Sequence, residues 1–510
     1  MPFPSSGCET CKIRRIKCDE TQPVCRKCIR AHRVCRGMGS GPSSYVVHSE
    51  NSYASGQHKR PRGPRSIRKT DGASSLATSS QPPPAGVDLK ALAIAEYLKN
   101  HLVIPKETPS ILRSTDGDLL PIWTAKGEHP ILDHAVSAIA LALFSRLHNY
   151  PPAVTEASLE YDRLLPIVRE SMPTLDGGNI DSYLLAVFFM SRYEDAVHIP
   201  ELSPANGSVE SKCNKYTSFS HHDGALAVLK MWKEHLSHHQ PVSNVIKHTR
   251  RGLIRSALLR KTALPECLIN GAAFGERGID LEYDNIVVRL VHVRERLAVL
   301  LKHAGAGEIN CHARTTALEA LDSETQSIDK ALQDMTTHFP STWSYKRHTR
   351  PVSTHSYPTQ DFFQSVVYSY SNVMYAGVWN LYFATRMLIN NTRLDILETT
   401  KFTPYDQTLG CSSVLNSIAN DLASSLPYCF GKFRVIQTQN SLEDVVAEVE
   451  GANFEFNVVR TAAWPLTIAS GLGYLDQEQK SWFQALLLRI GKLSGFGSLE
   501  SVGSRGGLNL

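Results

Sequence analysis

The sequence predicts a chain of three parts: a small cysteine-rich domain at residues 1–36, a flexible basic linker at 37–86 and a large all-α domain at 87–510. Three observations predict this division. Six of the eleven cysteines fall within residues 8–35, residues 37–86 contain few aliphatic side chains, and apolar residues recur at helical spacing beyond them. With 510 residues, 42% of them hydrophobic, the chain is long enough for more than one domain.

Charge is unevenly distributed along the chain, although its net value is only +5. Residues 1–40 contain nine Lys or Arg and three Asp or Glu, residues 41–90 contain seven and three, and the remainder contains 38 and 43. A basic arm before a mildly acidic body favours a polyanion as the partner of the arm. The first residues lack the pattern of a signal peptide, and the longest clearly apolar run, Ala135 to Phe144, is too short to span a membrane. We therefore expect neither secretion nor a membrane partner.

The six N-terminal cysteines form an internal repeat with the spacing C-x2-C-x6-C-x6-C-x2-C-x6-C. A structural zinc ion takes four thiolate or imidazole ligands in a tetrahedron. Six cysteines can serve two such ions if two sulfurs are shared, and the repeat suggests Cys8 and Cys25 as the shared pair. We therefore expect two Zn2+ ions per chain. The candidate ligands are Cys8, Cys11, Cys18, Cys25, Cys28 and Cys35.

A disulfide framework is the alternative for these cysteines, since six of them allow 15 pairings. The missing signal peptide favours metal, because cytosolic and nuclear compartments keep thiols reduced.

The segment between Cys11 and Cys18 is strongly basic and predicts a nucleic-acid contact. On a helix, Ile13 and Ile16 share one face that can pack on the metal cluster, and the basic side chains point outward. Arginine can read guanine in the major groove through O6 and N7. The candidate DNA-binding residues are Lys12, Arg14, Arg15 and Lys17. A solvated face or a localisation signal is the alternative interpretation of such a run.

Residues 8–35 resemble the DNA-binding binuclear zinc cluster of fungal transcription factors. The first half of that family usually reads C-x2-C-R-x-R-(K/R)-x-K-C, and this sequence departs from it only in Lys12. The resemblance implies two short helices, with Arg14 and Arg15 at CGG triplets and Lys17 near the phosphates. It also implies a nuclear regulator of RNA polymerase II transcription, with the loop proline at Pro23. In the second half, Arg30 and Arg33 suit phosphate contacts.

The linker contains a second basic run that makes it a candidate nuclear-import signal. Its basic residues are Lys59, Arg60, Arg62, Arg65, Arg68 and Lys69. Extra phosphate contacts are compatible with that role, and a merely solvated linker is the alternative. No sustained heptad occurs between residues 37 and 87, so a homodimer or a partner protein would have to pair through the helical body.

The body is expected to contain a dozen or more helices, in one or two lobes. The predicted helices are residues 89–98, 131–147, 158–172, 180–193, 223–236, a helix through 286–300, a core helix at 362–389 and one led by Asp476. Residues 433–436 are one of the few strand-like runs. The run 460–466 and the Trp482 helix ending at Gly491 resemble, more loosely, the helical regulatory region of many fungal transcription factors.

No enzyme is predicted, because the sequence lacks the G-x-S-x-G, H-E-x-x-H and phosphate-loop patterns. A second metal site from the histidines at 221–239 is less plausible than solvated loop histidines. The sequence thus favours a zinc-dependent, sequence-specific DNA-binding transcription factor. A zinc-stapled protein-interaction or co-regulator module is the alternative, and an enzyme with a DNA-tethering finger is a third hypothesis.

Overall fold

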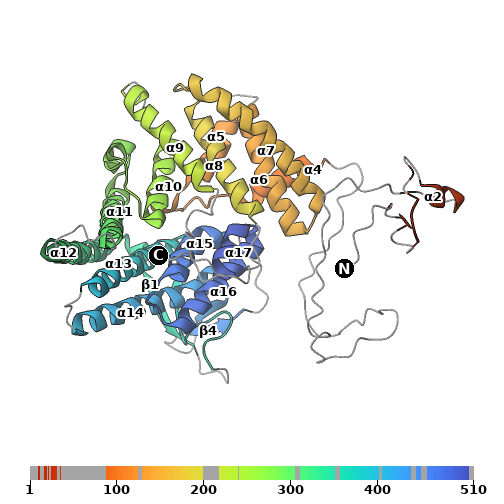
Figure 1. Ribbon diagram of the computed structural model, residues 1–510. Coiled ribbons are helices and arrows are strands. Elements are labelled where there is room, and N and C mark those ends of the chain that lie inside the picture. The colour runs from red at the N-terminus through yellow and green to blue at the C-terminus, as the bar shows by residue number, and fades with distance from the viewer. Residues whose placement is uncertain are drawn as a thin grey trace. The chain divides into compact units, whose positions relative to one another are not determined.

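The computed structural model describes residues 8, 10–11, 16–19, 21, 25–31, 35, 88–124, 129–198, 218–238, 241–304, 311–350, 356–400, 405–437, 444–449, 457–504 and 510. The chain divides into two compact units, Met1–Leu76 and Ala77–Leu510 (Figure 1). The first unit contains helix α2 (Arg26–Arg30), and the second contains the predicted helical body. The predicted linker at 37–86 lies outside the described residues.

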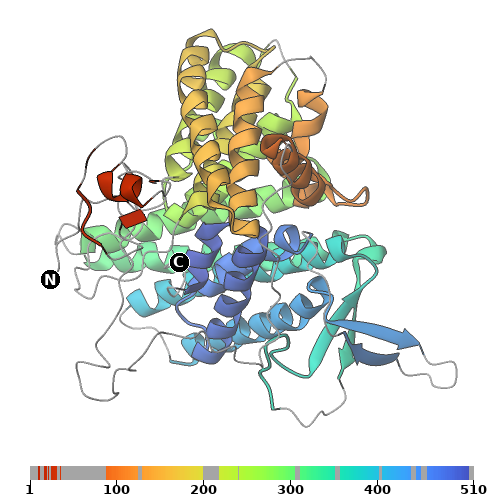
Figure 2. The same cartoon turned by 90° about the vertical axis from the view of Figure 1, so that its right-hand side faces the viewer.

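Helices of residues 89–260 make up the first half of the body, which occupies its upper part in Figures 1 and 2. They are α4 (Leu89–Tyr97), α5 (Leu119–Trp123), α6 (Pro130–His148), α7 (Pro151–Ser171), α8 (Ile180–Val197), α9 (Ser218–Met231) and α10 (Asn244–Arg260). Helix α6 lies at the centre of this half, because α4, α7 and α8 all pack against it. Its middle, from Ala135 to Phe144, is buried throughout, so the apolar run of the sequence serves as a core helix.

Helix α6 is also, among the described residues, the one helix whose length and composition would allow it to cross a membrane. In the fold, 61% of its most apolar window is buried. Core helices and signal sequences meet the same criterion, and the absence of a membrane partner stays a prediction.

Residues 278–504 form the second half, which lies below the first in both views (Figure 2). Its helices are α11 (Gly278–Ala304), α12 (Cys311–Met335), α13 (Val373–Thr399), α14 (Tyr405–Cys429), α15 (Asn457–Gly471), α16 (Gln477–Ser494) and α17 (Gly497–Ser504). Helix α13 is its core, with α12, α14 and α15 packed around it. The large all-α body predicted from the sequence is thereby confirmed in its main architecture.

Two antiparallel hairpins interrupt this helical pattern. Strand β1 (Tyr345–Thr349) pairs with β2 (Val366–Tyr370), and β3 (Phe433–Gln437) pairs with β4 (Asp444–Glu448). The predicted strand at 433–436 is confirmed as β3. The single core helix predicted for 362–389 is wrong in its first part, because the β-branched and aromatic residues of 366–370 form β2. Helix α13 begins only after Asn372, whose side chain accepts a hydrogen bond from the Met374 N–H.

Several helix ends follow from side chains that the sequence shows. Asp88 caps α4 by accepting hydrogen bonds from the backbone of Lys90 and Ala91, and Asp476 caps α16 in the same way. The predicted helix at 286–300 is part of α11, and its Ile286, Leu290, Val293 and Leu297 are buried. This burial agrees with a bundle helix and not with an exposed coiled-coil seam.

Gly491 is a position where α16 and α17 approach so closely that no side chain fits. A Cβ atom there would lie 2.6 Å from the backbone nitrogen of Glu500. Gly252, in contrast, is exposed on α10, and a Cβ atom there would meet nothing within 4 Å. Replacing glycine by alanine should therefore change the stability of the body in opposite directions at the two positions.

We expect Gly491→Ala to lower the free energy of unfolding of the body by about 1–3 kcal/mol, since overpacking moves backbone. Gly252→Ala should raise it by roughly 0.5–1 kcal/mol, since alanine is the better helix former. Denaturant unfolding of the two full-length variants measures both changes. Equal effects of the same sign would contradict the packing of α17 on α16.

Candidate metal centre and nucleic-acid interface

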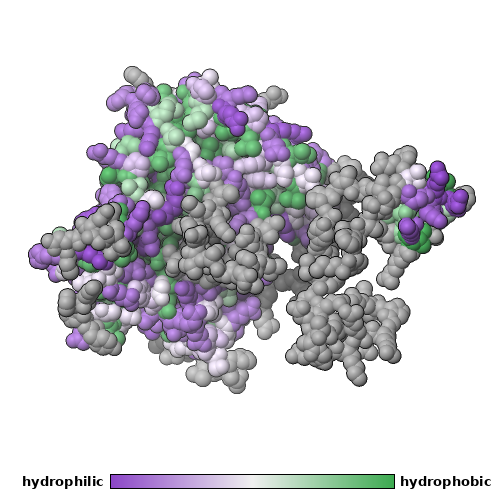
Figure 3. Space-filling model, in the orientation of Figure 1, coloured by the Kyte–Doolittle hydropathy of each residue, from purple (hydrophilic) through white to green (hydrophobic). Residues whose placement is uncertain are grey.

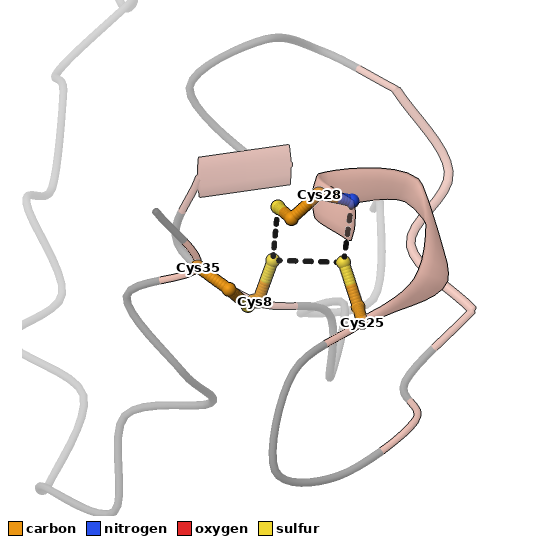
Figure 4. A group of neighbouring side chains, drawn as sticks. All are labelled: Cys8, Cys25, Cys28 and Cys35. Atoms are coloured by element: carbon orange, nitrogen blue, oxygen red, sulfur yellow. Dashed lines mark hydrogen bonds between the residues drawn. The ribbon is translucent and has the colours of Figure 1, made fainter. Parts of the chain in front are cut away.

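The structure brings the six N-terminal cysteines together in one cluster. Cys8, Cys11, Cys25 and Cys28 are buried, and Cys18 and Cys35 are half-buried against them. Their sulfur atoms form two groups of four, each with all its atoms within 4.8 Å of one another. One group is Cys8, Cys11, Cys18 and Cys25, and the other is Cys8, Cys25, Cys28 and Cys35. Cys8 and Cys25 thus belong to both groups, and Figure 4 draws the second group.

The distances between sulfur atoms suit metal ligands. The Sγ atom of Cys8 lies 3.6 Å from that of Cys25 and 3.8 Å from that of Cys28. Cys11 Sγ lies 3.6 Å from Cys25 Sγ. Thiolates bound to one tetrahedral Zn2+ lie about 3.8 Å apart, given a Zn–S bond of about 2.3 Å. A disulfide requires about 2.05 Å, and all six cysteines are free, so the disulfide alternative is not supported.

The repeat in the sequence is also a repeat in local structure. The Cys11 N–H donates to Cys8 Sγ at 3.4 Å. The Cys28 N–H donates to Cys25 Sγ at 3.3 Å, a hydrogen bond drawn in Figure 4. The same two N–H groups lie 3.1 Å and 3.0 Å from the carbonyl oxygens of Cys8 and Cys25. Each C-x2-C pair therefore forms one tight turn, and in the second half this turn starts α2, with Cys25 as its cap. This turn requires two residues between the cysteines, which is the spacing that each pair has.

Asp19 has a structural role that the sequence did not suggest. Its Oδ1 accepts hydrogen bonds from the Thr21 hydroxyl at 2.9 Å and from the Arg26 N–H, the first residue of α2, at 3.1 Å. Burial opposes ionisation of Asp19, but these hydrogen bonds outweigh it and lower the pKa of the carboxyl group. The side chain thereby links the loop between the two halves to the start of α2. The sequence feature that could have indicated this role is an Asp seven residues before the helix that begins within the second C-x2-C pair.

Burial raises the pKa of the Cys11 thiol and brings that of the Cys28 thiol to about 12. Such thiols are neutral at pH 7, whereas a thiol that coordinates a metal is deprotonated outright. Zinc binding at this cluster would therefore release protons, and zinc affinity would fall as the pH falls. Two Zn2+ ions and six thiolates carry a net negative charge, which the basic residues of this unit offset in part.

Only one of the four predicted DNA-binding residues lies in the described part of the chain. Lys17 is exposed, but it and Ile16 are not helical. Ile16 is 38% exposed, so it packs on the cluster less than predicted. Lys12, Arg14 and Arg15 lie outside the described residues, as do Pro23 and all six basic residues proposed for nuclear import.

Helix α2 presents further basic residues that were not predicted from the sequence. Arg26 and Lys27 are exposed on it beside the predicted Arg30, and Ile29 is 57% exposed among them. Hydrophilic side chains accordingly gather around α2 on the visible face of this unit, with a hydrophobic patch beside them (Figure 3). Their position next to the Cys25 and Cys28 ligands was a signal that could have identified them.

The histidines at 221–239 do not form a second metal site among the described residues of the body. His221 and His222 lie on α9 and not on a loop, because this helix begins at Ser218, earlier than predicted. His221 Nε2 lies 2.7 Å from Glu194 Oε1, and His222 Nδ1 lies 3.0 Å from the Ser256 hydroxyl. Both therefore serve helix packing.

Comparisons with known proteins agree with this geometry. Residues 6–40 match the family described as "Fungal Zn(2)-Cys(6) binuclear cluster domain". The "Transcriptional regulatory protein moc3" of Schizosaccharomyces pombe is 46% identical over 55 residues, which are 9% of this chain and 11% of that protein. The "Adhesion and hyphal regulator 1" of Candida albicans is 47% identical over 45 residues, 9% of this chain and 7% of that protein.

The "Lysine biosynthesis regulatory protein LYS14" of Saccharomyces cerevisiae is 52% identical over 33 residues, which cover 6% of this chain and 4% of its own. All three matches thus span about a tenth or less of the relative's length. No solved structure matches the chain. Spacing, sulfur geometry and the family match agree on residues 6–40: this segment is a binuclear cluster domain of the fungal Zn(2)-Cys(6) type, a domain that binds two zinc ions.

Proposed function

We propose that this protein is a zinc-dependent, sequence-specific DNA-binding transcription factor that acts in the nucleus. The observation that carries the proposal is the pair of four-sulfur groups that share Cys8 and Cys25. In the sequence, the basic segment lies between two of these candidate ligands, Cys11 and Cys18. The relatives' names, which are those of transcription regulators, support the same function.

In this proposal each basic residue has one of two tasks. Arg14 and Arg15 contact the guanines of a CGG triplet in the major groove, where paired hydrogen bonds to O6 and N7 distinguish guanine from other bases. Lys12 and Lys17 contact phosphates, which position the domain without reading sequence. Arg26, Lys27 and Arg30 of α2 are exposed and add positive charge on the second half. The linker residues Lys59 to Lys69 serve import or further phosphate contacts.

The helical body serves regulation and pairing and not catalysis in this proposal. One triplet offers little specificity, so a second copy of the chain or a partner protein supplies the rest through the body. The competing proposal is a zinc-stapled module that grips another protein. Exposed basic residues on both halves of the cluster favour a polyanion over that alternative.

An in vitro DNA selection with the full-length, zinc-loaded chain tests the proposal. We expect enrichment of sites that contain CGG, and loss of this enrichment when a chelator removes the zinc. Single triplets would indicate a monomer, and paired triplets at one spacing would indicate pairing through the body. A folded, zinc-loaded protein that enriches no sequence would overturn the proposal in favour of the protein-interaction module.

A further inference from the structure

A large cavity in the described part of the body lies between its two halves. It has a volume of about 250 Å3 and is lined by α4, α8 and α10 from the first half and by α13, α15 and α17 from the second. A single buried water needs only roughly 10–15 Å3 by this kind of measure, so the cavity has room for an organic molecule. A smaller cavity of about 40 Å3 adjoins it, since Arg255 and Trp464 line both.

The polar lining of the cavity is predominantly cationic. Its charged and titratable side chains are Tyr97, His101, Asp116, Arg192, Arg255 and Arg460. Burial, assisted by Arg192, lowers the pKa of His101 to about 3, so this imidazole is neutral at pH 7. Three guanidinium groups therefore face a single carboxylate.

Arg460 forms an ion pair with that carboxylate, which belongs to Asp116. Its Nη2 lies 3.0 Å from Asp116 Oδ2 and donates to the His101 carbonyl oxygen at 2.6 Å. The Ser114 hydroxyl also donates to Asp116. This pair joins α15 to the segment after α4 and is satisfied within the protein, so it adds no net charge to the cavity.

The other two arginines have no matching anion among the residues that line the cavity. Arg192 reaches Asp195 on its own helix only at 3.9 Å and keeps 40% of its side chain exposed. Arg255 has no hydrogen-bond or ion-pair partner within the described ranges of the body, and its guanidinium lies over the Trp464 ring at 5.5 Å. Burial lowers the pKa of Arg255, and the nearby charges of Arg251 and Arg192 lower it further. A half-buried cation that is repelled by its neighbours destabilises the free fold unless an anion joins it.

Aromatic rings complete the site beside these cations. Phe188 and Phe496 lie 5.4 Å and 5.1 Å from the Arg192 guanidinium, and Trp464 and Tyr97 line the same cavity. A ligand that suits both features carries an anionic head and an apolar, ring-sized body. Guanidinium groups pair equally well with carboxylate and phosphate, which present the matching acceptor geometry.

We propose that this cavity binds a small organic anion, with a carboxylate or phosphate head on Arg255 and Arg192 and an apolar body against Trp464, Phe188 and Phe496. Because its walls belong to both halves of the body, such a ligand stabilises their packing against each other. The site is built from residues 97–499 alone. A negative result for ligand binding would therefore leave the proposal of DNA binding unaffected.

Thermal unfolding of the full-length, zinc-loaded chain tests the ligand class with three probes: phenylacetate, phenyl phosphate and the neutral phenylacetamide. At saturation we expect at least one of the two anions to raise the Tm by about 2–5 °C, and phenylacetamide to leave it unchanged. Arg255→Gln should weaken binding of that anion by about 10–100-fold. Arg434→Gln, at an exposed position on β3, should leave binding unchanged.

Each outcome has a fixed meaning. A response to only one anion identifies carboxylate or phosphate as the natural head group. Neither anion exceeding phenylacetamide, or full binding by Arg255→Gln, would overturn the proposal.

A second measurement needs no ligand and compares two arginines of helix α10. Arg250 is fully buried and paired with Asp284 at 2.6 Å, and it also donates to the Leu268 and Ile269 carbonyl oxygens. Arg250→Met should lower the Tm of the body by several degrees. Arg255→Met removes an uncompensated charge and should leave the Tm unchanged or raise it by about 1–3 °C. A fall as large as that of Arg250→Met would show that Arg255 is structural and would overturn the proposal.

Discussion

Replacing Cys8 by serine is expected to release both zinc ions, whereas replacing Cys18 should release one. Cys8 belongs to both four-sulfur groups, while Cys18 belongs to one. A serine hydroxyl is a poor zinc ligand compared with the thiolate that it replaces. Each of the two zinc ions has four sulfur ligands only when all six cysteines are present. The zinc-to-protein ratio of the purified variants, measured by native mass spectrometry, checks this difference directly.

The same Cys8→Ser variant should lose DNA affinity by more than about 100-fold. Structural zinc contributes on the order of 10 kcal/mol to the folding of small domains, and a segment of this size has no other core. The helical body should keep its Tm, because it is a separate compact unit with its own hydrophobic core. Cys267→Ser, at a half-buried body cysteine, is the matched control and should change neither zinc content nor DNA affinity.

Two results would contradict this account of the cluster. Retention of one zinc ion by Cys8→Ser, with Cys18→Ser losing both, would show that the shared sulfur is not Cys8. Unfolding of the body when zinc is removed by a chelator would show that the two units are not independent.

Replacing Arg14 and Arg15 together by alanine should reduce affinity for a CGG site by about 30- to 10⁴-fold. Each paired contact to guanine is worth about 1–3 kcal/mol, and both would be lost. Zinc content should not change, because neither side chain is a candidate ligand. Fluorescence anisotropy with a labelled CGG duplex, and with a duplex in which the triplet is scrambled, measures affinity and specificity together.

Lys17→Ala is the matched control for the double variant, since Lys17 is exposed beside the ligand Cys18. It should weaken binding to both duplexes alike and reduce the salt dependence of binding by about one counterion. The double variant should instead bind both duplexes with the same low affinity. Retained preference for CGG in the Arg14/Arg15 variant would overturn the assignment of these residues to base recognition.

The sequence by itself determined the metal centre, because zinc coordination is local chemistry. The six candidate ligands and the shared pair were predicted from spacing and from the coordination number of zinc, and the two groups of sulfur atoms in the structure agree with that prediction. Long apolar patterns likewise determined α6, α8 and α11, since a buried stripe of helical period specifies a helix before its neighbours are known.

Tertiary structure decided what depends on residues far apart in the chain. Val366–Tyr370 form a strand because β1 supplies the hydrogen-bonding partners, which the apolar run alone does not reveal. Gly491 matters because α17 packs on its face of α16. Arg192, Arg255 and Arg460 look like ordinary helix-surface arginines in sequence, and only the packing of the two halves gathers them around one cavity. The physical reason is that a local pattern decides which face of a helix is buried, whereas long-range packing decides which other element that face packs against.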